Sequence, residues 1–185
     1  MTQIAVPEGS NTANPFIIAD AAKELIEFLI TVFGATDVPE ARTLDADGLI
    51  LHAELRIGDS LLTITDRKPD WPFTPAFTRV YVDNVDAVLA RAETHGGRIV
   101  TKPTEFFGEI LGRFQDPSGN LWWVYRHNPH AAADWSGADA ADAGTDKTAE
   151  DLDANGWENF STPELDYIHA TLVDAMTTLR DPRSA

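Results

Sequence analysis

Hydrophobic positions follow strand and helix spacing along the chain, in an order that occurs twice. A short apolar run at residues 16–18 predicts a strand, and a helical pattern over residues 21–33 follows it. Leu25, Leu29 and Val32 recur on one face of that pattern, which is typical of a helix that packs one side against a sheet. The N-terminal region therefore predicts a strand followed by an amphipathic helix.

The ends of this helix are marked by residues that favour helix termini. Asp20 is expected to cap the N-terminus, because an aspartate oxygen accepts hydrogen bonds from the first free amides of a helix. Gly34 is expected just past the C-terminus, where glycine takes a left-handed conformation at low cost. Residues 39–44 are then predicted as strand or loop.

Residues 49–57 alternate between two faces and predict a strand. The face expected to lie toward the helix carries Leu49, Leu51, Ala53, Leu55 and Ile57. The opposite face carries Ile50, His52, Glu54 and Arg56. A Gly-Asp pair at 58–59 predicts a tight hairpin into a second strand at 60–65. Residues 66–75 contain three prolines and no periodicity, so they predict a linker.

The same order returns after the linker. Residues 77–82 predict a strand, Asp83 and Asn84 a helix cap, and residues 96–97 the end of the helix. The apolar stripe of this second helix consists of Val85, Val88, Leu89 and Ala92.

The spacing of the two halves indicates an internal repeat. Asp20 and Gly34 are 14 residues apart, and so are Asp83 and Gly97. Each half would place one helix on one face of a four-stranded sheet and leave the other face free. The predicted fold class is therefore α+β, with paired β-α-β-β-β modules that form a curved mixed-sheet cup, followed by a C-terminal helix. Two unrelated α+β segments of similar size are the alternative.

The stretch 107–125 contains the most informative turn of the chain. Asp116 to Asn120 predict a tight reversal, because Pro117 fixes one backbone angle and Gly119 tolerates positive φ. The aromatic run that follows predicts a strand. This hairpin resembles the closing hairpin of the vicinal oxygen chelate superfamily, which includes glyoxalase I, extradiol dioxygenases and bleomycin-resistance proteins.

The resemblance covers about residues 14–127 and rests on three sequences: HAELRIGDS at 52–60, VYVDNVDAVLARAETHGG at 80–97 and GRFQDPSGNLWW at 112–123. Together they are most similar to the PhnB-like subgroup. The resemblance implies a domain at 1–127 with modules at about 14–66 and 77–127, in which two chains often build the cup together, so we expect a homodimer.

The remainder of the chain differs in composition. Residues 128–161 are acidic and poor in large apolar side chains, so we expect a flexible connector. Residues 162–181 predict an amphipathic helix that begins at Thr162 and Pro163. Its apolar stripe consists of Leu165, Ile168, Leu172, Val173, Met176 and Leu179. The sequence leaves open whether this helix covers its own domain, a second copy or another protein.

Composition narrows the classes of function. The chain has 30 acidic and 14 basic residues, a net charge of −16 and no cysteine, which excludes disulfides and disfavours nucleic acid as a partner. The overall field would favour a cationic ligand. No apolar stretch approaches the roughly 20 residues needed to span a bilayer, and no signal peptide is evident. We expect a cytoplasmic protein without a membrane partner.

The resemblance also implies a metal site, which the residues do not match. Enzymes of the superfamily hold a divalent ion with histidine and carboxylate ligands. The corresponding positions here are Asn14, Thr63 or Leu62, Phe77, and Trp123. Alkyl and aromatic groups cannot ligate a metal ion, so we expect no metal and no other cofactor.

Aromatic side chains provide the positive signal for a ligand. By strand parity Phe77, Arg79 and Tyr81 share a face, and Trp123 and Tyr125 do so in the last strand. Such groups offer flat apolar walls, and arginine can contact an anionic edge. The full predicted ligand-binding set is Trp71, Phe77, Arg79, Tyr81, Phe107, Glu109, Arg113, Trp123 and Tyr125. Some of these could instead fill the core; Phe114 and Trp122 are expected there.

His52 and Glu54 are the candidate catalytic residues. They share one strand face two residues apart, close enough to transfer a proton or to bind one ion, although a solvated polar sheet face is the simpler explanation. We therefore expect metal-independent binding of a small aromatic or cationic molecule, antibiotics among the candidates. The alternatives are a glyoxalase-type lyase, isomerase or dioxygenase, with a displaced metal or His52/Glu54 chemistry, and an interaction module that uses the C-terminal helix.

Overall fold

Both halves of the chain form the same strand–helix–three-strand unit in the computed structural model, which describes residues 6–129 and 162–184. The first module contains β1 (Phe16–Ala19), α1 (Ala22–Phe33), β2 (Thr36–Leu44), β3 (Ile50–Ile57) and β4 (Ser60–Asp66). The second contains β5 (Phe77–Tyr81), α2 (Val85–Thr94), β6 (Arg98–Phe106), β7 (Glu109–Gln115) and β8 (Leu121–Arg126). A C-terminal helix, α4 (Pro163–Thr178), and a short 3-10 helix, η3 (Pro182–Ser184), follow.

The two sheets have the same topology. Their strand orders are β1-β4-β3-β2 and β5-β8-β7-β6, with β1 parallel to β4, β5 parallel to β8 and the other pairs antiparallel. The predicted α+β class and the paired modules are thereby confirmed. Because the two sheets are separate hydrogen-bonded units, the predicted cup is divided into two surfaces, one on each sheet.

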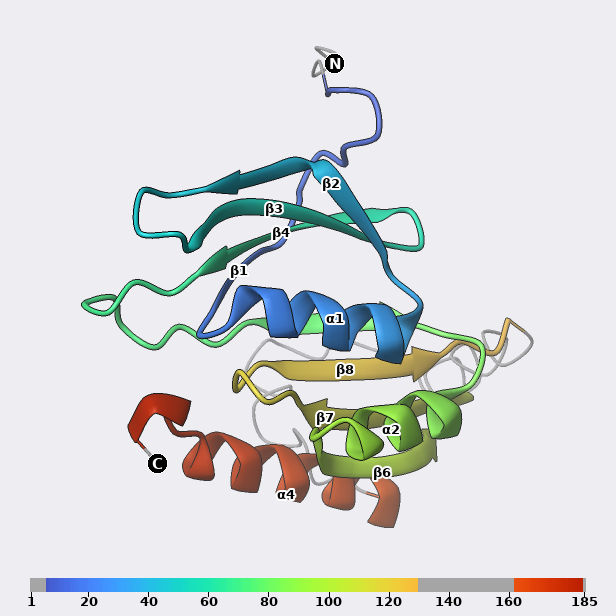
Figure 1. Cartoon of the computed structure of the whole chain (residues 1–185). Coiled ribbons are helices and arrows are strands. Elements are labelled where there is room, and N and C mark those ends of the chain that lie inside the picture. Colours follow the sequence, from blue (N-terminus) through green and yellow to red (C-terminus); the bar gives the residue numbers. More distant parts are fainter. Residues whose placement is uncertain (1–5, 130–161, 185) are drawn as a thin grey trace, which may run out of the picture.

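The helix-covered faces of the two sheets share one hydrophobic core. Phe28 of α1 lies 5.9 Å from Phe114, ring centroid to centroid, and Phe33 lies 5.2 Å from Trp122. Figure 1 shows α1 between the first sheet and β8. Phe114 and Trp122 are both fully buried, as predicted. The faces without these helices therefore lie on the outside of the two-module unit.

Sequence periodicity placed both helix stripes correctly. The buried residues of α1 include Leu25, Leu29 and Val32, and those of α2 are Val85, Val88, Leu89 and Ala92. Helix α2 comes closest to β7 at Gly112, where an added Cβ would lie 2.8 Å from Leu89.

One strand face was predicted wrongly at its start. Thr43 pairs with His52 and Leu44 with Ile50, so a single step along β2 corresponds to two steps along β3. Leu51 is the extra residue of this bulge, and it is 46% exposed instead of facing the helix. The bulge brings Ile50, predicted on the opposite face, into the core.

The ends of α1 and α2 confirm most of the predicted caps. Gly34 follows α1 with φ 68°, and the Asn84 side chain accepts a hydrogen bond from the Ala87 amide at 2.9 Å. Asp20 does not cap α1. The Ala22 amide donates instead to Asp66 at 2.7 Å, and the Asp20 carboxylate lies 2.6 Å from the Nε atom of Arg67.

The predicted turn at 116–120 is held by one buried carboxylate. Asp116 accepts hydrogen bonds from Trp122 Nε1 at 2.8 Å and from the Asn120 amide groups at 2.9 and 3.0 Å. Burial raises the pKa of Asp116, and these hydrogen bonds oppose that rise. Gly119 has φ 90° and lies under the Phe73 ring, so the position excludes larger residues.

Helix α4 docks on the chain's own second sheet, which answers a question that the sequence left open. Thr162 caps the helix, as predicted, by accepting from the Leu165 amide at 3.3 Å. The helix packs along β6, on the face of the sheet opposite α2 (Figure 1). Leu165, Ile168 and Ala175 are its buried residues. Of the predicted stripe, Val173 and Met176 are half exposed, because the contact follows a narrower line along the helix.

An ion cluster connects the end of the chain to the first module. Arg67 is 2% exposed, and its guanidinium donates to Asp181 at 2.7 and 3.0 Å besides its contact with Asp20. Arg183 lies 3.0 Å from Asp20 and donates to the Arg67 carbonyl at 2.7 Å. The hydrogen bond with Arg67 lowers the pKa of Asp181. This cluster fixes the residues after α4 against β1 and β4.

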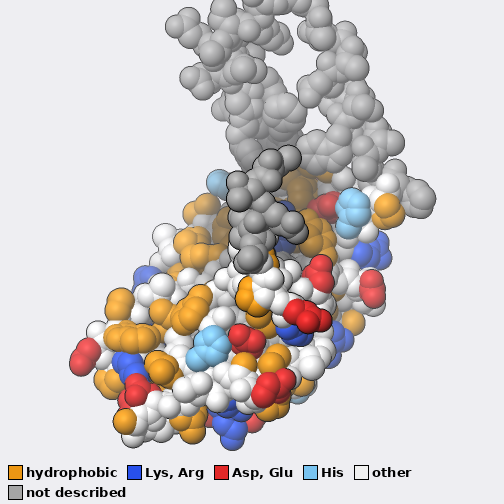
Figure 2. Space-filling model, turned by 90° about the horizontal axis from the view of Figure 1, so that it is seen from above, with side chains coloured by type: hydrophobic (Ala, Val, Ile, Leu, Met, Phe, Trp, Pro, Cys, Tyr) orange, Lys and Arg blue, Asp and Glu red, His pale blue; other side chains and the backbone are white. Residues whose placement is uncertain are grey.

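The outer face seen in Figure 2 mixes acidic, basic and hydrophobic side chains. Leu51 and Leu44 belong to the exposed hydrophobic residues of the first module. Among the described residues no helix is both long and apolar enough to cross a membrane. The predicted connector at 128–161 lies outside the described residues, apart from its first two positions. The expected homodimer remains a prediction.

Replacing Arg67 should destabilise the fold. Arg67→Met removes the cation and leaves Asp20, which is 18% exposed, without its closest partner. Arg183 still lies 3.0 Å from Asp20, so the loss corresponds to charged hydrogen bonds and should cost about 2 kcal/mol. Urea denaturation should therefore show a lower free energy of unfolding. Arg98→Met is the control, because among the described residues the exposed Arg98 guanidinium bonds only Gln115, and its loss should cost less than about 0.5 kcal/mol. Equal effects of the two variants would contradict the role of the cluster.

Candidate ligand-binding surface

The face of the second sheet on which α4 docks brings together aromatic rings and guanidinium groups on the strands next to the helix. The parallel register pairs Arg79 of β5 with Trp123 of β8 and Tyr81 with Tyr125. We name this the aromatic–arginine surface, and it consists of Phe77, Arg79, Tyr81, Arg113, Trp123 and Tyr125. All six belong to the ligand-binding set predicted from sequence.

The rings of this surface contact one another, and Phe77 and Tyr81 remain open to solvent, whereas Tyr125 is buried. Phe77 lies 6.0 Å from Trp123 in an edge-to-face arrangement, and Tyr81 lies 5.7 Å from Tyr125. Phe77 is 51% exposed and Tyr81 is 56% exposed. Adjacent exposed aromatic side chains are unusual on a protein surface and are typical of binding sites.

Arg79 is the accessible cation of the surface. Its guanidinium carbon lies 4.7 Å from the centre of the Tyr125 ring. A hydrogen bond with Tyr81 raises the pKa of Arg79, and burial raises the pKa of Tyr125. No ion pair joins Arg79 to a carboxylate in the described part of the chain. A charged group in this setting can bind the anionic or carbonyl edge of an aromatic molecule.

Arg113 lies beneath α4 and is 4% exposed. It donates to the Ile168 carbonyl at 2.7 Å and to the Thr101 hydroxyl at 3.1 Å, and it lies 5.3 Å from the centre of the Trp123 ring. Burial without a carboxylate partner lowers the pKa of Arg113. The prediction that Arg113 contacts a ligand directly is corrected here, because α4 covers it. Arg113 supports Trp123 from below instead.

Glu109 and Phe107 lie at one end of the surface. Glu109 bonds the Nδ1 atom of His127 at 2.9 Å. Phe107 contacts Phe106, whose ring lies 6.3 Å from that of Tyr125. Sequence reasoning did not place His127 at the site, since it follows the last residue of β8, where alternation no longer indicates a face.

A cavity adjoins the aromatic–arginine surface at Arg79 and Tyr81. It has a volume of about 340 Å³ and lies between β5 and the turn that joins β3 to β4. Arg79 and Tyr81 line it together with Pro15 and Leu62. A flat ligand on the rings could therefore extend a side group toward the first module.

Trp71, His52 and Glu54 lie away from this surface. Trp71 is 41% exposed in the loop after β4 and takes part in none of the ring contacts found among the described residues. His52 Nε2 lies 3.4 Å from Glu54 Oε1, both partly buried on the first sheet. The first sheet thus carries a separate pair capable of proton transfer.

The metal positions implied by the family resemblance do not form a ligand set. The Asn14 side chain is occupied by hydrogen bonds with Asn11. Thr63 lies on the first sheet beside Phe16, and Phe77 packs its ring against Trp123. These groups do not fit a divalent ion. The described residues bring together no group of three His, Cys, Asp or Glu side chains that could hold one.

Comparisons with known proteins agree with the topology. The model of the Glyoxalase/Bleomycin resistance protein/Dioxygenase superfamily matches residues 12–124. No curated protein matches the chain.

Three solved structures show the same fold. Protein PA1353 from Pseudomonas aeruginosa is 22% identical with a TM-score of 0.52, over 64% of this chain and 98% of that one. TioX from Micromonospora sp. ML1 is 22% identical with a TM-score of 0.50, over 63% and 99%. The PhnB protein from Bacillus cereus is 18% identical with a TM-score of 0.51, over 63% and 99%.

Weakening the contact of α4 should expose Trp123. Ile168 is 8% exposed and packs against Leu111 and Tyr125, so Ile168→Ala should cost about 2 kcal/mol in unfolding free energy. Acrylamide quenching of tryptophan fluorescence should increase. Val173→Ala on the same helix is the control, because Val173 is 50% exposed and its truncation should change neither quantity. Unchanged quenching in Ile168→Ala would contradict the proposed cover.

Proposed function

The chain belongs to the glyoxalase/bleomycin resistance protein/dioxygenase superfamily, and from this premise we propose that it binds a small planar aromatic molecule, without a metal ion, on the aromatic–arginine surface. One observation carries the proposal: Phe77 and Tyr81 are exposed on either side of Arg79, which has no carboxylate partner in the described residues. This arrangement provides apolar walls for a ring and a cation for its polar edge.

The position of the surface supports the proposal further. Phe77 and Trp123 stand where metalloenzymes of the family carry ligands, according to the resemblance, so ring-shaped apolar groups replace charged ones. Antibiotics with flat aromatic groups are candidate ligands. Assignment to the PhnB-like subgroup is also part of the proposal, because the likeness to the Bacillus cereus protein supports the fold alone.

A bound aromatic molecule should quench the fluorescence of Trp123. We expect quenching by at least one member of a panel of planar aromatic compounds that includes aryl carboxylates and amphiphilic antibiotics. Trp123→Phe should remove most of the quenching, whereas Trp71→Phe, which changes an exposed tryptophan outside the surface, should retain it. Arg79→Gln should weaken aryl carboxylates about tenfold, a loss of one charged contact. A panel without any quenching would refute the proposal.

Ligand binding should not depend on a metal ion. The untagged protein should bind no stoichiometric nickel, manganese, zinc or iron(II) in calorimetric titrations, because the family's ligand positions hold an amide, a hydroxyl or alkyl group and two aromatic rings. Aromatic quenching should persist in excess chelator. Tight binding of one metal ion per chain would instead favour an enzyme.

An enzyme of the glyoxalase type is the second candidate, and the His52–Glu54 contact of 3.4 Å favours it. A histidine held by a carboxylate can act as a general acid or base. The third possibility, partner binding through the C-terminal helix, would have to use the half-exposed Val173 and Met176, since Leu165 and Ile168 are buried on the second sheet.

A further inference from the structure

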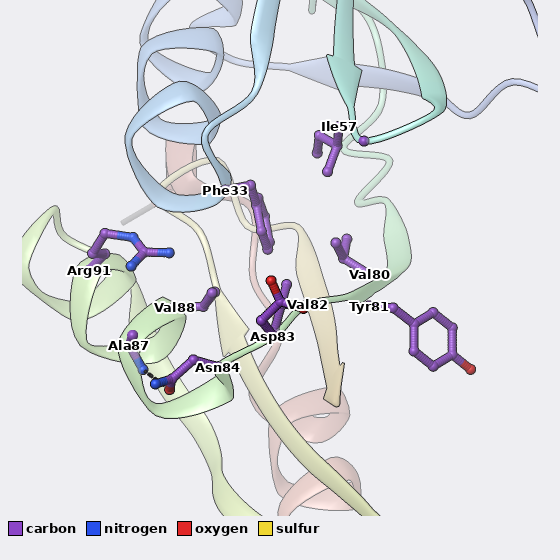
Figure 3. Close-up of a pocket in the computed structure, with 11 residues that line it drawn as sticks. Phe33, Ile57, Val80, Tyr81, Val82, Asp83, Asn84, Ala87, Val88 and Arg91 are labelled. Carbon is purple, nitrogen blue, oxygen red and sulfur yellow. Dashed lines mark hydrogen bonds between the residues drawn. The ribbon is translucent and has the colours of Figure 1, made fainter. Parts of the chain in front are cut away.

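A second cavity lies at the junction of the two modules, next to the cavity that Arg79 and Tyr81 line. We name it the junction cavity. Its volume is about 390 Å³, within the range of ligand pockets. It is bounded by the end of α1, the turn between β3 and β4, the end of β5 and the first half of α2. Tyr81 is among its lining residues, and Figure 3 shows the Tyr81 ring pointing away from the other labelled side chains.

The walls of the junction cavity are apolar and come from both modules. Phe33 and Ile57 belong to the first module, and Val80, Val82 and Val88 to the second. Val88 is buried, and the other four are partly buried and packed against the common core. The core therefore reaches this cavity without filling it, which leaves apolar surface available to a guest.

Two of the polar side chains around the cavity, those of Arg91 and Asn84, already make hydrogen bonds within the protein. Arg91 donates from Nε and Nη2 to the Val32 carbonyl at 2.9 and 2.7 Å. The Asn84 side chain caps α2 through the Ala87 amide. The Asp83 carboxylate has no hydrogen bond or ion pair with any described residue. Figure 3 draws Asp83 on the opposite side of Val88 from Arg91, so the carboxylate is the available charge.

We propose that the junction cavity binds a small amphiphilic cation, with its apolar part between Phe33, Ile57 and Val80 and its ammonium group on Asp83. An ammonium–carboxylate contact is a charge-assisted hydrogen bond, stronger than a neutral one. The net charge of −16 raises the local concentration of cations around the chain. A guest in this position contacts both modules and stabilises their association. Asp83 does not belong to the aromatic–arginine surface, so a variant of Asp83 tests this cavity separately from that surface.

Calorimetric titration of the full chain with n-octylamine at pH 7 tests the proposal. At that pH the amine is protonated. We expect one site per chain and an affinity about tenfold higher than for 1-octanol, which has a similar apolar chain but no charge. Asp83→Asn should lower the octylamine affinity about tenfold. Asp86→Asn is the matched control, because Asp86 is an acidic residue in the first turn of α2 that does not line the cavity; its affinity should stay within about twofold of the parent.

A second variant tests the location independently of charge. Ala87 lines the junction cavity from α2, and Ala87→Phe should fill it and abolish octylamine binding, with an intact far-ultraviolet circular dichroism spectrum as evidence of folding. Absence of octylamine binding to the parent chain would overturn the proposal. So would equal affinities of the Asp83→Asn and Asp86→Asn variants, or full binding by a folded Ala87→Phe variant.

Discussion

A four-stranded sheet has two faces, and a single helix can cover only one of them. This constraint organises the whole structure. The helix-covered faces of the two sheets meet in one core, where Phe28 and Phe33 of α1 contact Phe114 and Trp122 of the second sheet. Each module thereby retains an outer face, and the differences between the two outer faces determine what the chain can bind.

Helix α4 makes the two outer faces unequal. It covers the second sheet along β6 and contacts β7 and β8 through Ile168, and the Arg67–Asp181 contact fixes the residues that follow it. The helix covers Arg113 and at the same time provides the Ile168 carbonyl as an acceptor for it, beside the Thr101 hydroxyl. Since α4 occupies this half, the exposed rings of the aromatic–arginine surface are Phe77 and Tyr81 of β5. The position of this surface is thus a consequence of where the C-terminal helix docks.

Sequence reasoning succeeded where local pattern decides the structure. Alternation in β5 and β8 placed Phe77, Arg79 and Trp123 on one face, because both strands run without a bulge. It failed where distant segments decide. Leu51 is exposed, contrary to the prediction, because β3 has one more residue than β2 between two neighbouring pairs. Asp20 does not cap α1, because its carboxylate contacts Arg67 instead. Arg113 is covered by α4, which begins about 50 residues later in the chain. The local hydrophobic pattern around Arg113 could not predict this contact.

The charge of the nearest side chain, more than the net charge of the protein, distinguishes the aromatic–arginine surface from the junction cavity. At −16 the overall field favours cations everywhere outside the protein, yet the aromatic–arginine surface presents Arg79 without a carboxylate partner in the described residues. The Debye length at physiological salt is about 8 Å, so a ligand within contact distance responds to the nearest charges before the distant ones. In the function that we propose, the guanidinium therefore selects an anionic or carbonyl edge on one side of β5. On the other side, Asp83 selects a cation, in agreement with the overall field. Two sites on adjacent segments of one chain can in this way accept ligands of opposite charge.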